Sequence, residues 1–366
     1  MQVVEKLKAF WQSLSEGLSL QQLWSQFLRE TKVSYRLYKV EVGGRNDDVS
    51  PTRRIFRLIR ATFWAMLLKL SPPRRIGLLV ALVLFVWGFL TGRDSVAALG
   101  SLGVLALLGL ELADRVAMKR DLQIAREIQS WLVPRTPPPA PGVDVAFATR
   151  PANTVAGDYY DVFLCPSAGM PGQRLILVVA DVAGKGMPAA LLMATFQSSL
   201  RTLVQEALPL AALVSRLNRY CCDHSLDGRR FTTSVLAQLD CPTGTLDYVN
   251  AGHNPPALRR ANGEIVTLAS GGLPLGIQAD ASFESGSVTL GPGDQLLIYT
   301  DGVVDARDAR GAEYGEARLL DLLRGPRPAS AAESLNRLMS SVDSFTGNAP
   351  RFDDVTCVFV HYTGAR

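Results

Sequence analysis

The chain divides by its hydrophobic pattern into an N-terminal part with helical spacing and a C-terminal part with mostly strand-like runs. Up to residue 42, apolar residues recur at three- and four-residue steps among Lys, Glu and Gln, as in amphipathic helices. Over residues 53–68, arginines interleave with apolar residues and lead into an aromatic patch, which suits a cytoplasmic membrane interface. We predict an amphipathic and basic helical region over residues 1–75, either a packing helix pair or a membrane-surface attachment.

Residues 76–112 are almost wholly apolar apart from a short polar break at 91–94. As one straight helix, about 37 residues would extend roughly 55 Å, well beyond the roughly 30 Å hydrocarbon core of a bilayer. We therefore predict a transmembrane helical hairpin with arms 76–90 and 95–112, with one span plus an interfacial helix as the alternative. Because Arg and Lys flank both outer ends, the positive-inside rule puts both ends of the hairpin in the cytoplasm.

Residues 113–140 are predicted to be a connector helix followed by a proline-rich linker. Apolar residues keep three- and four-residue steps over 111–133, and five prolines between 134 and 141 then end the helix. The apolar stripe is about two heptads long, which suits either a homodimer seam or an amphipathic connector lying on the next domain.

The remaining segment, residues 141–366, carries short apolar runs that are mostly strand-like, with a few helical intervals. Short turns at 242–244 and 261–263 separate neighbouring runs and indicate antiparallel pairing. Few strand-helix-strand crossovers remain, so we predict an α+β domain in which helices cover antiparallel sheets. The predicted strands are 143–149, 159–164, 174–182, 232–239, 245–250, 256–259, 265–268, 288–290, 295–300 and 355–362, and the predicted helices are 188–206, 209–226, 316–323 and 330–344.

Composition and charge narrow the class of protein. The chain is 48% hydrophobic and 20% charged, which is too apolar for a disordered protein. Its formal net charge is only +4, and much of the arginine surplus lies before residue 125. We therefore expect a membrane surface as the partner of this charge and no nucleic acid.

Several aspartates stand at the ends of predicted strands. Asp181 follows six apolar residues, 175–180, and precedes the glycine-containing turn 184–186. A desolvated carboxylate needs a partner, although each such aspartate alone could also be a solvated turn residue. Carboxylates that converge repel one another unless they are protonated or bridged by cations, and Mg²⁺ or Mn²⁺ prefers such oxygen ligands. The other acids placed in this way are Asp158, Asp301, Asp353 and Asp354.

This donor set favours metal-assisted hydrolysis of phosphate esters over other chemistries. Two metal ions between carboxylates can acidify a water and hold phosphoryl oxygens as charge develops. The turn 184–186 is not a nucleotide-binding Walker loop, because Gly186 stands where Ser or Thr would hold Mg²⁺. Zinc is disfavoured because the three histidines lie in separate segments without metal-ligand spacing.

Several short blocks follow one another along the C-terminal part of the chain. They are 125–129 with 132–134, 151–152 through 155–161, 181–186, 250–256, 272–276, 299–302 and 352–356. Taken in order, these blocks resemble the metal-dependent protein phosphatases of type 2C, in the bacterial SpoIIE/RsbU branch. The resemblance covers roughly residues 120–362, and its specificity lies in the ordered set. Ala156 stands where the family usually has Gly, and Ala183 where it usually has Ser.

The resemblance implies a serine/threonine phosphoprotein phosphatase with two Mn²⁺ or Mg²⁺ ions between two antiparallel sheets flanked by helices, a four-layer α-β-β-α fold. It makes Asp158, Asp181, Asp301 and Asp353 the catalytic metal ligands. The backbone carbonyl of Val182 and the Asp354 carboxylate complete the implied set of metal ligands. Family substrates are often phosphorylated regulatory proteins of the anti-anti-sigma-factor type. With the hairpin, this implies a multi-pass protein of the inner membrane with its catalytic domain in the cytoplasm.

Some alternatives stay open at this stage. A membrane-anchored pseudophosphatase that only binds phosphoproteins would need a decayed site, and a nucleotide phosphodiesterase would share the ions but not the ordered blocks. We expect His253 to be a structural hydrogen bonder, and Asp161 and Asp305 to cap or pair. Lys185 either meets substrate phosphate or faces water.

Overall fold

The computed structural model of the protein describes residues 70–165, 174–224, 230–269 and 271–364, together with Arg60, Phe63, Trp64, Leu67 and Leu68. The chain forms two compact units, Met1–Val116 and Ala117–Arg366. The predicted amphipathic and basic region, 1–75, lies almost entirely outside the described residues.

The first unit contains a helical hairpin, as predicted. Helix α4 (Pro72–Leu90) leads through a short turn into helix α5 (Asp94–Leu132), which continues without a break through the predicted connector. Glycines let the two helices approach closely, because a Cβ atom built on Gly100 would lie 2.4 Å from the backbone nitrogen of Phe85. The Arg74 guanidinium donates a 2.5 Å hydrogen bond to Asp114 and thereby links the two helices again, near the start of α4.

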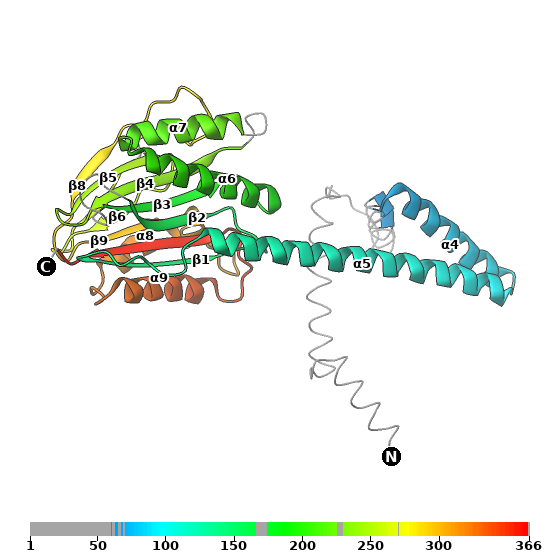
Figure 1. The fold of residues 1–366 in the computed structure, drawn as a ribbon. Coiled ribbons are helices and arrows are strands. Elements are labelled where there is room, and N and C mark those ends of the chain that lie inside the picture. The colour runs from blue at the N-terminus through cyan, green and yellow to red at the C-terminus, as the bar shows by residue number, and fades with distance from the viewer. Residues whose placement is uncertain are drawn as a thin grey trace, which may run out of the picture. The chain divides into compact units, whose positions relative to one another are not determined.

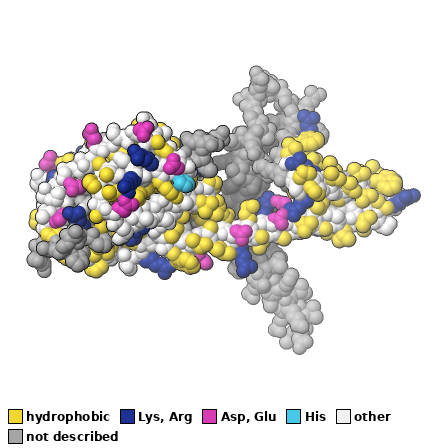
Figure 2. Space-filling model, turned by 45° about the horizontal axis from the view of Figure 1, so that its top comes forward, with side chains coloured by type: hydrophobic (Ala, Val, Ile, Leu, Met, Phe, Trp, Pro, Cys, Tyr) yellow, Lys and Arg dark blue, Asp and Glu magenta, His cyan; other side chains and the backbone are white. Residues whose placement is uncertain are grey.

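The surface of this hairpin is apolar. Both helices are long and apolar enough to cross a membrane, and few of their side chains are buried within the protein. Leucines at 99, 102, 105 and 108 are all exposed on α5. Hydrophobic side chains accordingly cover most of the visible hairpin surface in Figure 2.

The second unit contains two five-stranded sheets in which all strands pair antiparallel, as the turn signals predicted. The first sheet has the order β1-β10-β9-β6-β7, and the second β2-β3-β4-β5-β8. The strands of the first sheet are β1 (Val143–Arg150), β6 (Ala257–Arg259), β7 (Ile265–Thr267), β9 (Gln295–Tyr299) and β10 (Val355–Tyr362). Those of the second are β2 (Tyr159–Cys165), β3 (Arg174–Val182), β4 (Thr232–Asp240), β5 (Thr245–Ala251) and β8 (Gly286–Thr289).

Helices cover the outer face of each sheet, so the unit has four layers (Figure 1). Helices α6 (Met187–Leu203) and α7 (Leu210–Asp223) pack on the second sheet, with the 3₁₀ turn η1 (Val204–Glu206) between them. Helices α8 (Gly315–Arg324) and α9 (Ala331–Thr346) pack on the first sheet. One apolar cluster lies between each sheet and its helices, and a third fills the space between the two sheets. The predicted α+β class with helix-covered antiparallel sheets is confirmed.

Candidate active site

Asp158 and Asp181 lie opposite each other at one end of the second sheet. The register of β2 and β3 pairs Tyr159 with Ala180, which brings the residue before β2 beside the residue near the end of β3. Asp158 is buried and Asp181 is partly exposed. The apolar run that precedes Asp181 is buried on both faces, so the strand delivers this carboxylate to the edge of the interior.

Asp301 and Asp353 lie at the matching end of the first sheet. Strands β9 and β10 pair Tyr299 with Cys357, so the residues just after β9 and just before β10 are neighbours. Asp301 begins the 3₁₀ turn η2 (Asp301–Val303). Thr300 joins the two sheets here, because its hydroxyl donates a 2.9 Å hydrogen bond to the buried carboxylate of Asp158. The sequence carries no local signal for this role of Thr300, although the residue belongs to the block 299–302.

The electrostatics of these carboxylates are unfavourable for ionisation. Burial raises the pKa of Asp158 well above its usual range, and the neighbouring Asp181 carboxylate adds to this shift. Burial raises the pKa of Asp181 to about 7, with further contributions from Asp301, Asp353 and Asp354. The pKa of Asp301 is raised by burial and then by Asp353. The aspartates from the two sheets therefore act on one another across a shared site.

Two glycines allow close backbone approach at this site. A Cβ atom built on Gly157 would lie 3.2 Å from the carbonyl oxygen of Val182, the predicted backbone ligand. A Cβ atom built on Gly302 would lie 2.0 Å from the carbonyl oxygen of Asp354. Since no side chain fits at Gly302, the small residues beside the aspartates set the distance between the strand ends.

The Asp354 carboxylate is hydrogen-bonded to the backbone of the loop that precedes β2. Its two carboxylate oxygens accept hydrogen bonds from the backbone N–H groups of Ala152 and Gly157, both at 2.7 Å. A carboxylate that accepts two backbone N–H groups holds a loop in place. Asp354 therefore positions the loop that carries Asp158.

Lys185 contacts one of the site's aspartates. Its ammonium group forms a 2.9 Å ion pair with Asp353 and also donates to the carbonyl oxygen of Phe352. Both side chains of the ion pair are about half exposed, so the pair is open to exchange with other charged groups. Neither interpretation of Lys185 from the sequence included this ion pair.

The donor set fits hard divalent cations. Within the described residues, Asp158, Asp181 and Asp301 form no ion pair, and Lys185 acts favourably on Asp301, whereas burial and neighbouring carboxylates dominate at Asp158 and Asp181. Bound divalent cations would relieve such repulsion, and carboxylate and carbonyl oxygens are the ligands that Mg²⁺ and Mn²⁺ prefer. No group of three or more His, Cys, Asp or Glu side chains in the described parts of the chain has the arrangement of a formed metal site.

Two further residues from the matched blocks have structural partners. Asp161 is fully buried and accepts two hydrogen bonds from the Arg201 guanidinium, at 2.7 and 2.9 Å. His253 is buried and its Nδ1 lies 2.8 Å from the Thr233 hydroxyl. Burial lowers the pKa of His253 to about 4, so the ring is neutral at pH 7. Both residues have the pairing and hydrogen-bonding roles expected from the sequence.

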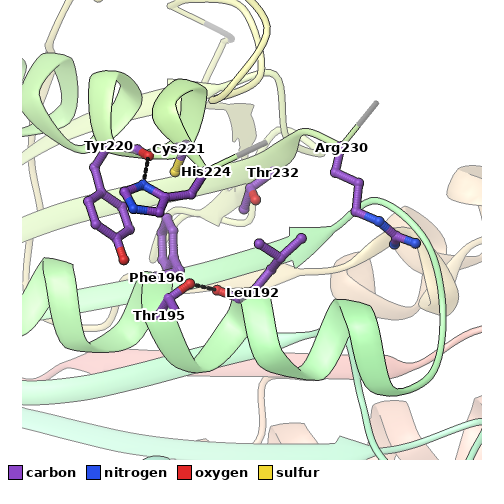
Figure 3. A pocket seen from close by; sticks show the side chains of 8 residues that line it. All are labelled: Leu192, Thr195, Phe196, Tyr220, Cys221, His224, Arg230 and Thr232. Atoms are coloured by element: carbon purple, nitrogen blue, oxygen red, sulfur yellow. Dashed lines mark hydrogen bonds between the residues drawn. The ribbon is translucent and has the colours of Figure 1, made fainter. Parts of the chain in front are cut away.

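A separate pocket lies between α6, α7 and the start of β4 (Figure 3). Its eight lining residues include no acidic side chain, and the rings of Tyr220 and His224 stack at 4.2 Å. The Arg230 guanidinium points away from these two rings (Figure 3) and donates a 3.0 Å hydrogen bond to the carbonyl oxygen of Ala183. Arg230 thus supports the turn after Val182, a role for which the sequence carried no signal.

Comparisons with known proteins agree with this fold. The chain is 28% identical to Protein IcfG of Synechocystis sp. over 70% of this chain and 43% of that protein. It is 27% identical to the phosphoserine phosphatase RsbU of Bacillus subtilis over 53% of this chain and 56% of that protein. The chain thus spans about half the length of these curated relatives.

A solved structure shares the fold. The SiaA-PP2C domain of Pseudomonas aeruginosa superposes with a TM-score of 0.59 at 19% identity, and the match covers 68% of this chain and 98% of that domain. The predicted four-layer arrangement is thereby confirmed. The family model of Stage II sporulation protein E (SpoIIE) matches residues 171–363, which is more than half of the 366 residues. The chain therefore belongs to the SpoIIE family, and it shares the fold of a PP2C domain.

Proposed function

We propose that this chain is a membrane-anchored protein serine/threonine phosphatase. Its substrate would be a regulatory protein carrying phosphoserine or phosphothreonine, of the anti-anti-sigma-factor type that the family resemblance implies. The observation that carries the proposal is the meeting of Asp158 and Asp181 from one sheet with Asp301 and Asp353 from the other. The name of the relative RsbU, a phosphoserine phosphatase, supports the same activity.

The chain's own residues would divide the work as follows. Asp158, Asp181 and the Val182 carbonyl would hold one cation, and Asp301 and Asp353 the other. Two Mn²⁺ or Mg²⁺ ions, when bound, would supply the positive charge that acidifies a water and stabilises the phosphoryl oxygens. Asp354 would position the Asp158 loop through its hydrogen bonds to Ala152 and Gly157.

The helical hairpin would anchor the protein in the inner membrane as a multi-pass protein. The exposed apolar side chains of α4 and α5 support lipid contact, since a soluble hairpin would have to leave this surface in water. Arginines at the start of α4 and basic residues after residue 114 support a cytoplasmic location for both ends and for the catalytic domain.

The 111–133 part of α5 would form a homodimer and control the site. Ile128, Val116 and Trp131 are exposed on this helix in the single chain. Replacing Leu122 and Ile128 by Asp should convert a dimer of the full chain to a monomer, measured by light scattering in detergent, and lower the phosphatase activity. A wild-type protein that is monomeric would contradict the homodimer.

The phosphatase proposal can be tested with the full chain in detergent micelles. The protein is incubated with Mn²⁺ and, in turn, p-nitrophenyl phosphate, a phosphoserine protein and a cyclic dinucleotide. We expect Mn²⁺-dependent phosphate release from the first two substrates and none from the dinucleotide. Asp181→Asn should abolish the release, whereas Asp240→Asn, at the end of β4 where it caps a turn, should not.

The pseudophosphatase and phosphodiesterase alternatives give different results in this assay. Binding of the phosphoserine protein without phosphate release would favour the pseudophosphatase, and hydrolysis of the cyclic dinucleotide alone would favour the phosphodiesterase. Phosphate release that is the same in wild type and Asp181→Asn would reject the site.

A further inference from the structure

A pocket rich in arginine shares a wall with the proposed active site. Gly302 and Asp353, which belong to that site, also line a pocket formed by the ends of β1, η2, α9 and the approach to β10. We call it the arginine pocket. Its charged and aromatic lining includes Arg150, Arg307, Asp343, Arg351 and Phe352.

The charges of the arginine pocket are unbalanced. Arg150 forms an ion pair with Asp343, and the Arg351 guanidinium lies 3.9 Å from the same carboxylate. One acid therefore faces two guanidinium groups. Arg307 pairs at 2.7 Å with Glu313, which does not line the pocket. The lining thus holds three guanidinium groups, those of Arg150, Arg307 and Arg351, against the two carboxylates of Asp343 and Asp353, and Asp353 is also paired with Lys185.

The arginines are held by exchangeable partners. The side chains of Asp343, Arg351 and Arg307 are between 44% and 47% exposed. Ion pairs at such exposure are weak, so an incoming carboxylate can replace or share the present partners. Arginine also offers a fork of N–H donors that matches the two oxygens of a carboxylate.

An aromatic ring completes the surface. Phe352 directly precedes Asp353, and its side chain is 55% exposed. The Arg307 guanidinium lies over this ring, with its carbon 5.6 Å from the ring centroid. An exposed aromatic ring contributes little to the core, whereas a ring capped by a guanidinium offers an apolar and a cationic contact side by side.

We propose that the arginine pocket binds an acidic segment of the protein substrate, next to the phosphorylated residue in the site. The inference rests on the proposed phosphatase function and specifies its substrate class. The wall shared through Asp353 lets one extended peptide reach both places, since neighbouring residues of an extended chain are about 3.3–3.6 Å apart along it. Several spaced guanidinium groups fit a run of acidic side chains better than a single phosphate.

Binding can be measured separately from hydrolysis. Three fluorescent peptides carry a non-hydrolysable phosphonate analogue of phosphoserine, flanked by Glu, Gln or Lys, and their dissociation constants for the full chain with Mn²⁺ are measured by anisotropy in detergent. We expect the Glu peptide to bind about five- to tenfold more tightly than the Gln peptide, and the Lys peptide to bind most weakly. The preference should shrink at high salt because exposed charges are screened.

Charge reversal tests the residues. Arg351→Glu and Arg307→Glu should each remove or invert the preference for the Glu peptide, and Arg351→Gln should reduce it if a charge reversal harms folding. The matched control is Arg216→Glu on α7, which also replaces a surface arginine in an ion pair but lies on the opposite helical layer. Arg216→Glu should keep the preference. An equal effect of all variants would overturn the proposal.

Hydrolysis of the same peptides made with phosphoserine separates this proposal from the phosphatase function. Charge-selective binding without hydrolysis of any peptide would keep the pocket and reject the phosphatase. Hydrolysis with equal binding of the Glu, Gln and Lys peptides would keep the phosphatase and reject the pocket.

Discussion

The side-chain amide of Gln129 pairs with the backbone of Ala156 in both directions. Its Nε2 group donates to the Ala156 carbonyl oxygen at 2.7 Å, and its Oε1 atom accepts from the Ala156 N–H at 3.0 Å. Ala156 is buried and lies two residues before Asp158. Helix α5 is therefore joined directly to the loop that carries a proposed metal ligand, and a change in the helix can reach the site through this pair.

Replacing Gln129 by Leu should lower phosphatase activity about tenfold or more at saturating Mn²⁺. The substitution leaves a buried backbone N–H and a buried carbonyl without partners, which costs about 1–3 kcal/mol each and is relieved by movement of the Asp158 loop. The measurement is kcat on a phosphoserine protein, with the melting temperature beside it. Gln123→Leu is the matched control, since Gln123 is exposed on the same helix. Equal activity of the two variants would contradict a role for the pair.

Asp181→Asn should stabilise the metal-free protein at pH 8. The pKa of Asp181 in the fold, about 7, lies above the value of about 3.9 in unfolded chains. Between these two pKa values the folded state holds a proton that the unfolded state releases, so the contribution of Asp181 to stability is most favourable below a pH of about 4 and is lost as the pH rises through about 7. A gain of about 2–4 kcal/mol for Asp181→Asn at pH 8 follows from this shift.

Chemical denaturation in EDTA at pH 5 and pH 8 measures this difference. The wild type should lose stability between the two values relative to Asp181→Asn. Added Mn²⁺ should restore the wild type and leave Asp181→Asn almost unchanged, because binding to the folded state stabilises it. A wild type that is more stable than Asp181→Asn in EDTA at pH 8 would be the contrary result.

The sheets were predictable because their strands are buried. Strand β3 was predicted at its observed limits, and its apolar run, 175–180, is buried at every position. The edge strand β8 was predicted at 288–290 and observed at Gly286–Thr289, since its residues alternate only between half-buried and exposed. The ends of a strand can therefore be predicted where its residues are clearly buried, and they are predicted less well for a half-exposed edge strand.

The contacts that organise the site were not predictable. Asp354 and Gly157 are 197 positions apart, and nothing local to either residue signals their hydrogen bond. The same holds for Arg230 and the Ala183 carbonyl, 47 positions apart. The sequence could identify aspartates at strand ends because that signal is local. The sequence does not show which carboxylate binds a loop backbone and which one faces another carboxylate. Those contacts depend on how strands far apart in the chain pair with each other.

Lys185→Met should tighten Mn²⁺ binding about two- to fivefold. The Lys185 ammonium group pairs with Asp353 at 2.9 Å and so competes with a cation for that carboxylate. The gain is small because an exposed ion pair contributes little. Isothermal titration of Mn²⁺ into the full chain measures it, with Lys119→Met on the exposed surface of α5 as the control. Weaker Mn²⁺ binding by Lys185→Met than by Lys119→Met would show that Lys185 does not compete for Asp353.

Arg201→Ala should destabilise the protein by about 3–5 kcal/mol without weakening Mn²⁺ binding. The Asp161 carboxylate is fully buried, and loss of its two bonds from Arg201 leaves a buried charge without its cation. Replacing both residues, with Asp161→Leu and Arg201→Met, should recover much of this loss because no unpaired charge remains. Urea denaturation and Mn²⁺ titration of Arg201→Ala, of the single variant Asp161→Leu and of the double variant check this pair of effects. If Asp161 were instead a metal ligand, both variants that carry Asp161→Leu would lose Mn²⁺ binding, including a double variant as stable as the wild type.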